Sequence, residues 1–142
     1  MNILLGIFTI LFNQYILLTL LLSLFSSTQS NYVIYLKIKG PGEKNIINNS
    51  FRYTPSQILI NGELKGSNQK SCILNNNGYN NVTLIFNERI ETCENMFNGL
   101  SDILEIDLSH FDTSQVINMN SMFSGCKSLE KINFNNINTS LV

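Results

Sequence analysis

The order of apolar and polar residues predicts a small β-sheet beyond residue 30. Residues 32–39 alternate with a period of two, which is typical of a strand with one buried face. The segment 57–65, QILINGELK, carries Asn61-Gly62 between short apolar runs, and this dipeptide favours the positive φ angles of a type I′ hairpin. Residues 82–86 form another β-branched and aromatic run. We therefore expect a β-rich N-terminal cap over residues 31–86.

From residue 90 onward, the chain repeats its own pattern with a period of 26 residues. Met96-Phe97 corresponds to Met122-Phe123, and Ile106 corresponds to Ile132, so that apolar positions recur in step. A repeat of this length indicates stacked units of a solenoid, in which such residues form a stacked core. The pattern predicts a repeat region over residues 87–142, with units at 90–115 and 116–141.

Each unit has two halves with different periods. The second half has leucine-rich spacing, and its alternating apolar residues predict a short strand. In the first unit these residues are Ile103, Ile106, Leu108 and Phe111. In the first half, apolar residues recur every three or four positions, which is typical of a short helix or 3₁₀ turn. The oxygen-bearing side chains of 112–114 suit its start, and Gly99 and Gly125 suit its end. We therefore expect an α+β, β-rich fold, with a strand and a short helix in each repeat.

The repeat carries a specific sequence signature. The segment FDTSQVINMNSMFSGCKSLEKINF resembles the BspA-like leucine-rich-repeat surface proteins, whose unit runs roughly TSxVxxMxxMFxGCxSLxxLxLSxFxT, and the resemblance covers about residues 82–142. The agreeing positions include Thr113-Ser114, Val116, Met119, Met122-Phe123, Gly125-Cys126 and Ser128-Leu129. The preceding copy departs from the pattern, with Leu100 in place of the usual cysteine and 87–89 in place of Thr-Ser. The resemblance implies exposure at the cell surface and binding or adhesion, without catalytic residues.

The N-terminal segment predicts membrane targeting. No charged side chain occurs before Lys37, and residues 3–25 are almost entirely apolar. The run YILLTLLLSLF has the length of a signal-peptide core, and small residues follow it, so we expect cleavage near Ser30. The alternative is an uncleaved signal anchor, because residues 3–25 could cross a hydrocarbon core of about 30 Å. Residues 1–30 are thus a signal peptide or anchor, and we expect an extracellular or cell-surface protein.

Composition excludes several functions. The net charge is −1 and only 13% of the residues are charged, so the chain lacks the basic patch that nucleic acid binding requires. Cys72, Cys93 and Cys126 allow at most one intrachain pair, and their spacing does not match a zinc site. The single histidine, His110, corresponds to Asn136 in the next unit, which favours a solvated position over a catalytic base. We expect no enzyme activity, no cofactor and no metal.

Some polar residues could nevertheless contact a ligand. Those that alternate with the apolar positions of the predicted strands form a candidate contact face for a protein or cell-surface ligand. They are Glu105, Asp107, Ser109, Lys131, Asn133 and Asn135. In a translocated chain, Asn48, Asn81 and Asn138 would also be candidate N-glycosylation sites, because each begins an Asn-x-Ser/Thr triplet.

The second unit runs out where a third would begin, leaving an apolar end. Stable stacks usually need three or more repeats. We therefore expect a fragment of a longer array or, as the alternative, an end covered by a partner, by self-association or by the β-rich region. The main hypothesis is a surface binding module. Its rival is a single-pass membrane-anchored structural protein without a ligand of its own.

Overall fold

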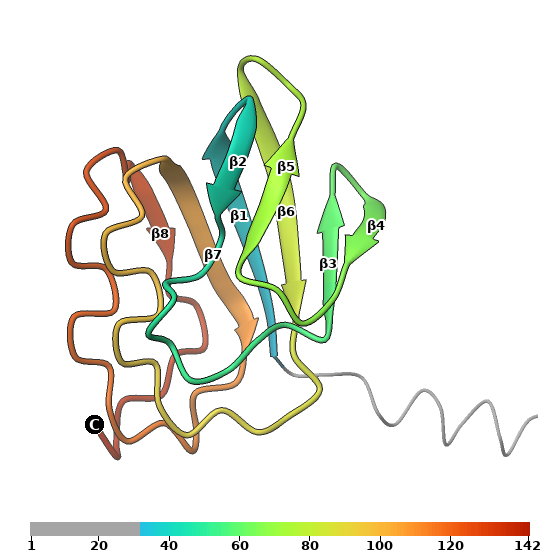
Figure 1. Ribbon diagram of the computed structural model, residues 1–142. Helices are drawn as coiled ribbons and strands as arrows, with labels where there is room; N and C mark the ends of the chain where they lie inside the picture. Colours follow the sequence, from blue (N-terminus) through green and yellow to red (C-terminus); the bar gives the residue numbers. More distant parts are fainter. Residues whose placement is uncertain (1–31) are drawn as a thin grey trace, which may run out of the picture.

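The structure is a computed structural model that describes residues 32–142 (Figure 1). The predicted signal peptide or anchor at 1–30 lies outside the described residues. Among those that are described, no helix is long and apolar enough to span a bilayer.

Two β-sheets make up the fold. The strands are β1 (Tyr32–Lys39), β2 (Gly42–Asn45), β3 (Gln57–Ile60), β4 (Glu63–Gly66), β5 (Ser71–Leu74), β6 (Tyr79–Ile85), β7 (Ile103–Phe111) and β8 (Lys131–Asn133). Six of them form one sheet in the order β4-β3-β6-β1-β7-β8, and β2 pairs with β5 in a second sheet. All pairs are antiparallel except β7 and β8, which are parallel. The hairpin predicted over 57–65 is confirmed, because β3 and β4 flank Asn61 and Gly62 at φ angles of 51° and 86°.

Strand β1 is central because it joins the two regions that the sequence separates. It pairs with β6 on one side and with β7 on the other, so the predicted cap and the repeats share one sheet. Its alternation buries Ile34, Leu36 and Ile38, as the period of two predicts, and leaves Tyr35 exposed.

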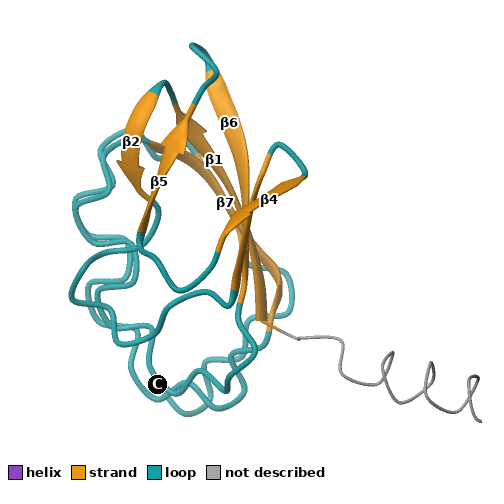
Figure 2. Cartoon of the chain, turned by 45° about the vertical axis from the view of Figure 1, so that its right-hand side comes forward, coloured by secondary structure: helices purple, strands orange, loops and turns teal. Residues whose placement is uncertain are grey.

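The repeat region forms two coils that follow the same path, the first coil (residues 90–115) and the second coil (residues 116–141) (Figures 1 and 2). The pairs Glu105–Lys131 and Ile106–Ile132 are aligned across β7 and β8, and Thr92 forms a bridge with Asn118. Each of these partners lies 26 residues further along the chain. The period in the sequence is therefore the register of the stack.

The prediction of a short helix in each repeat is wrong, because the first half of each coil is a series of turns. Asn95 and Ser121 have φ angles of 57° and 55°, and Gly99 and Gly125 have φ angles of 75° and 73°. A left-handed residue interrupts a right-handed helix, so these positions break each run after about one turn. The glycines also permit close stacking, since a Cβ on Gly125 would lie 3.2 Å from the Gly99 Cα.

The predicted fold class, a leucine-rich-repeat solenoid behind a β cap, is likewise wrong. The described residues form an all-β structure in which the strands of the coils complete a mixed sheet. The spacing of apolar residues could not reveal this arrangement, because alternate amides in the turns of the first coil bond to carbonyls of the second coil, whereas the amides of a helix would bond within the helix.

The core lies between the six-stranded sheet on one side and the two-stranded sheet with the turns of the coils on the other (Figure 2). Its largest fully buried side chains include Phe51, Phe86, Phe97 and Phe111. The predicted stacked core is present, because the rings of Phe97 and Phe123 stack with centroids 6.1 Å apart and planes inclined by 11°. Both regions of the chain thus contribute to one hydrophobic core.

Candidate binding face

A groove of about 490 Å³ crosses the solvent side of the six-stranded sheet over β6, β1, β7 and β8. The polar and aromatic residues that line it are Tyr35 and Lys37 from β1, Tyr79, Asn81 and Thr83 from β6, Glu105 and Asp107 from β7, and Lys131 and Asn133 from β8. We call these nine residues the outer face.

The strand register brings these residues together from distant parts of the chain. Lys37 is aligned with Asn81 on one side and Glu105 on the other, and Glu105 is aligned with Lys131. Because side chains directly opposite each other across strands lie on the same face of a sheet, these four residues form one row. In order across the sheet, the row consists of the Asn81 amide, the Lys37 cation, the Glu105 anion and the Lys131 cation.

Charge at the centre of the row is paired. The Lys37 Nζ lies 2.8 Å from the Glu105 Oε1 and 4.3 Å from the centre of the Tyr79 ring. The hydrogen bond from Lys37 holds the pKa of Glu105 below its ordinary value, and the same bond raises the pKa of Lys37. Both groups therefore stay ionised near neutral pH, and the Tyr79 ring adds a cation–π contact.

Asp107 is held in place by its own strand and by β8. Its Oδ1 accepts a hydrogen bond from the Ser109 amide at 2.8 Å. Burial raises the pKa of Asp107, but hydrogen bonds from Ser109 and the Asn133 side chain outweigh this effect and keep the pKa below its ordinary value. The carboxylate is a fixed acceptor beside the row.

Two tyrosines give the outer face its apolar surface. Tyr35 is 43% exposed and Tyr79 is 51% exposed. Tyr35 packs edge-on against His110, with ring centroids 5.8 Å apart. Of the residues on the outer face, tyrosine is the type that is enriched at protein interfaces.

Four of the six residues predicted as a contact face line the groove, namely Glu105, Asp107, Lys131 and Asn133. Ser109 and Asn135 do not. The pairing of β1 with β7 shifts register between Val33 and Tyr35, which breaks the alternation near Ser109 and brings His110 opposite Val33. Strand β8 ends at Asn133, so Asn135 lies beyond it.

Sequence reasoning missed the residues that the N-terminal region contributes. Tyr35, Tyr79 and Asn81 line the groove because β1 and β6 lie beside β7. The alternation of residues 32–39 already placed Lys37 on the polar face of a strand. No local pattern indicated which strand would be its neighbour.

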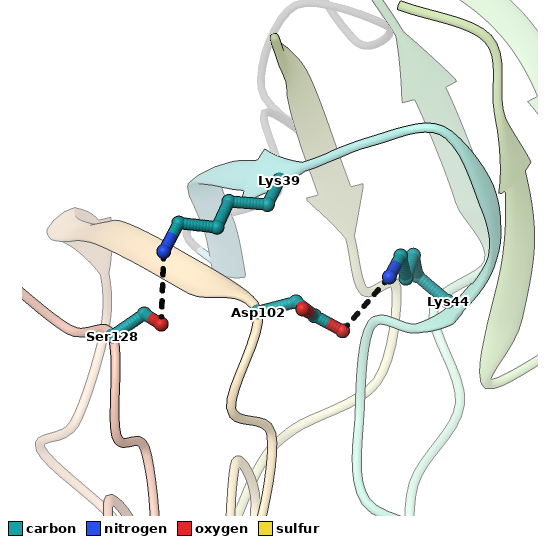
Figure 3. A network of polar contacts seen from close by, with 4 residues as sticks. All are labelled: Lys39, Lys44, Asp102 and Ser128. Atoms are coloured by element: carbon teal, nitrogen blue, oxygen red, sulfur yellow. Dashed lines mark hydrogen bonds and ion pairs between the residues drawn. The ribbon is translucent and has the colours of Figure 1, made fainter. Parts of the chain in front are cut away.

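Polar contacts also fasten the N-terminal region to both coils (Figure 3). The Lys44 Nζ lies 3.0 Å from the Asp102 Oδ2, and the Lys39 Nζ donates to the Ser128 Oγ at 3.2 Å. Asp102 and Ser128 occupy equivalent positions of the two coils. Two lysines of one segment therefore bind the same position in successive coils.

The three candidate glycosylation sites differ in their surroundings. The Asn48 Nδ2, the atom that would carry the sugar, donates to the Asn98 carbonyl at 2.6 Å. Asn81 is exposed and lies in the groove, and Asn138 is exposed on the second coil. A sugar on Asn81 would occupy the outer face, whereas Asn48 is already engaged in the fold.

Asp102 forms an ion pair with Lys44, whereas Asp107 and Asp112 accept hydrogen bonds from amides two residues further along the chain. Asp112 Oδ1 accepts from the Ser114 amide at 2.8 Å, and the equivalent Asn138 Oδ1 accepts from the Ser140 amide at 2.9 Å. Within residues 32–142, no group of three histidine, cysteine, aspartate or glutamate side chains could hold a metal ion. Cys72, Cys93 and Cys126 are free thiols.

The model of a family described as "Mycoplasma protein of unknown function, DUF285" matches residues 70–142, which is about half of the chain. The chain belongs to this family. No curated protein and no solved structure matches it.

This result corrects the assignment to BspA-like leucine-rich-repeat surface proteins, because no model of such a family matches. The agreeing positions are those that the stack itself requires, such as the left-handed Gly125 and the buried Val116 and Met122. A motif made of such positions indicates that the chain forms stacked coils. It does not show to which family the chain belongs.

Proposed function

We propose that the protein is a binding module, secreted or held at the cell surface, whose outer face contacts a protein ligand. The observation that carries the proposal is the groove, in which Tyr35 and Tyr79 stand beside the charged row centred on Lys37 and Glu105. Surface localisation is supported by the apolar segment at residues 3–25.

The chemistry of the outer face favours a protein as ligand. Tyrosine is enriched among residues that dominate binding energy, because it offers a large apolar surface at a low cost in conformational entropy. The row of Lys37, Glu105 and Lys131 carries both signs of charge, which suits a surface of mixed charge better than a polyanion.

An array of purified extracellular proteins tests the proposal. The full chain, fluorescently labelled and kept in mild detergent, is expected to bind at least one protein saturably. The double variant Tyr35→Ala/Tyr79→Ala should weaken that binding by at least about tenfold, which corresponds to about 1.4 kcal/mol, because truncating one tyrosine at the centre of an interface can cost about 2 kcal/mol.

The matched control is Leu64→Ala/Ile73→Ala, which removes two apolar side chains that are 66% and 68% exposed and lie outside the groove on β4 and β5. This variant should bind as the natural chain does. The proposal would be contradicted by the absence of saturable binding, or by equal binding of the two double variants.

A further inference from the structure

Three Asn-Gly dipeptides lie in the described part of the chain, at 61–62, 77–78 and 98–99. Asparagine before glycine is prone to spontaneous deamidation, because glycine has no side chain to hinder attack of its backbone nitrogen on the asparagine side chain. The reaction requires the asparagine Cγ to approach that nitrogen. Hydrogen bonds that hold either group therefore slow the reaction, and the three dipeptides differ in these bonds.

At the first dipeptide, both ends of the side-chain amide are held. The Asn61 Oδ1 accepts a hydrogen bond from the Asn81 backbone amide at 3.0 Å, and the Asn61 Nδ2 donates to the Asn80 Oδ1 at 3.2 Å. Asn61 also lies in the turn between β3 and β4, at a φ angle of 51°. Attack by the Gly62 nitrogen requires this side chain to turn, which breaks both hydrogen bonds.

At the third dipeptide, the attacking nitrogen is itself engaged. The Gly99 amide donates to the Ser124 carbonyl of the second coil at 2.7 Å. The half-buried Asn98 donates through its Nδ2 to the Asn95 Oδ1 at 2.8 Å. The nitrogen must lose its proton during the reaction, and here a hydrogen bond holds that proton. The fold therefore restrains both reacting groups.

The dipeptide at 77–78 has neither restraint. Asn77 and Gly78 are exposed in the loop between β5 and β6 (Figure 1). Within residues 32–142, neither the Asn77 side chain nor the Gly78 amide forms a hydrogen bond. A Cβ built on Gly78 would meet no atom beyond its chain neighbours within 4 Å, so there is open space beside the nitrogen. The Asn77 side chain is therefore free to approach it.

We propose that Asn77 is a site of spontaneous modification, at which the side-chain amide is converted to a carboxylate as the folded protein ages. The Gly78 nitrogen attacks the Asn77 Cγ and forms a C–N bond, and ammonia leaves with the proton from that nitrogen. Water then opens the resulting succinimide ring at either carbonyl. The products are aspartate and isoaspartate, in which the main chain runs through the former side chain.

The modification changes the charge beside the outer face. The new carboxylate comes two residues before Tyr79, whose ring contacts the Lys37 ammonium at 4.3 Å. Both products add one negative charge, since a neutral amide becomes a carboxylate. The inference does not depend on the proposed function, because it concerns the chemistry of the loop alone.

Isoaspartate also adds a methylene group to the main chain between two fixed points. On one side, the buried Asn80 side chain bonds to the Asn76 amide and to the Asn76 carbonyl, each at 3.2 Å. On the other side, the Gly78 carbonyl accepts from the Gly40 amide at 3.3 Å. Isoaspartate should therefore displace the loop, whereas aspartate leaves the length of the main chain unchanged.

The test follows the full chain, folded in mild detergent at mildly alkaline pH, over time. Digestion and mass spectrometry then measure aspartate and isoaspartate at each site. Asn77 should be deamidated at least about tenfold faster than Asn61 and Asn98, because these two must first break hydrogen bonds. In urea the three rates should agree within about threefold, since the same dipeptide then reacts without the fold.

A substitution tests the attacking nitrogen. Gly78→Ala fits the fold, because Gly78 lies outside the left-handed region and has space for a Cβ. Its methyl group hinders the approach to Cγ and should slow deamidation of Asn77 by at least about tenfold. The control Asn75→Ala, at an exposed residue of the same loop, should leave that rate unchanged. In NMR spectra, the Gly40 amide signal should shift in the isoaspartyl form and stay in place in Asn77→Asp.

Two results would overturn the proposal. The first is deamidation of Asn61 or Asn98 as fast as that of Asn77 in the folded protein. The second is an unchanged rate at Asn77 in Gly78→Ala. An unshifted Gly40 amide in the isoaspartyl form would overturn the displacement of the loop.

Discussion

Replacing Asn48 by alanine tests how much the contact of this side chain with the first coil contributes to the stability of the fold. The Asn48 Nδ2 donates to the Asn98 carbonyl at 2.6 Å, and its Oδ1 accepts from the Ser50 amide at 2.8 Å. A hydrogen bond contributes about 0.5–1.5 kcal/mol to stability, and an acceptor left unsatisfied in a buried site costs about 1–3 kcal/mol. Asn98 is half-buried and Ser50 is exposed. We therefore expect the free energy of unfolding to fall by about 1–3 kcal/mol.

Urea unfolding followed by circular dichroism measures this change, with the slope m expected to stay constant. Asn48→Asp separates the two roles of the side chain, because it keeps the acceptor for Ser50 but places a carboxylate against the Asn98 carbonyl. It should destabilise the fold at least as much as Asn48→Ala.

Asn49→Ala is the matched control, since Asn49 is exposed and contacts Lys70 through its backbone carbonyl. The reasoning is refuted if Asn48→Ala stays within about 0.5 kcal/mol of the natural chain. It is also refuted if Asn48→Asp is as stable as the natural chain.

Three further predictions concern the core, the ion pair and the thiols. Phe97→Ala should lower the free energy of unfolding in urea by about 3–5 kcal/mol, because Phe97 is fully buried. In an NMR titration, Lys37→Ala should raise the lowered pKa of Glu105 toward its ordinary value. The stabilisation that the ion pair gives the folded protein is present above the unfolded-state pKa of glutamate. It disappears as the pH falls through the folded-state pKa of Glu105. Burial raises the pKa of Cys72 to about 11 and that of Cys93 to about 12, so alkylation at pH 8, measured by mass spectrometry, should be far slower in the folded protein than in urea.

Local patterns predicted the strands well where one face is buried. The alternation of residues 32–39 and the Asn61-Gly62 dipeptide gave a strand and a hairpin that the structure contains. The same reasoning failed for the first half of each coil. A spacing of three or four is shared by helices and by turns whose amides bond to a neighbouring coil, and only the neighbour decides between them.

The residues of the candidate site also fall into those that local patterns predicted and those that they did not. The period of two identified Glu105, Asp107, Lys131 and Asn133, but it misplaced Ser109, because a register shift cannot be read from one strand alone. Tyr35 and Tyr79 line the groove because β1 pairs with β6 and β7, and these pairings could not be predicted from the sequence of any one strand.

The repeat period, the inward apolar positions and the left-handed glycines could be predicted from the amino-acid sequence, because they depend on properties of single residues and on their spacing. The pairing of β1 with β6 and β7, and the contacts of Asn48 with the Met96 and Asn98 carbonyls of the first coil, could be found only from the three-dimensional structure. Those outcomes depend on hydrogen bonds between segments far apart in the chain. Such bonds leave no periodic signal in either segment, since each backbone donor or acceptor can be satisfied by many partners.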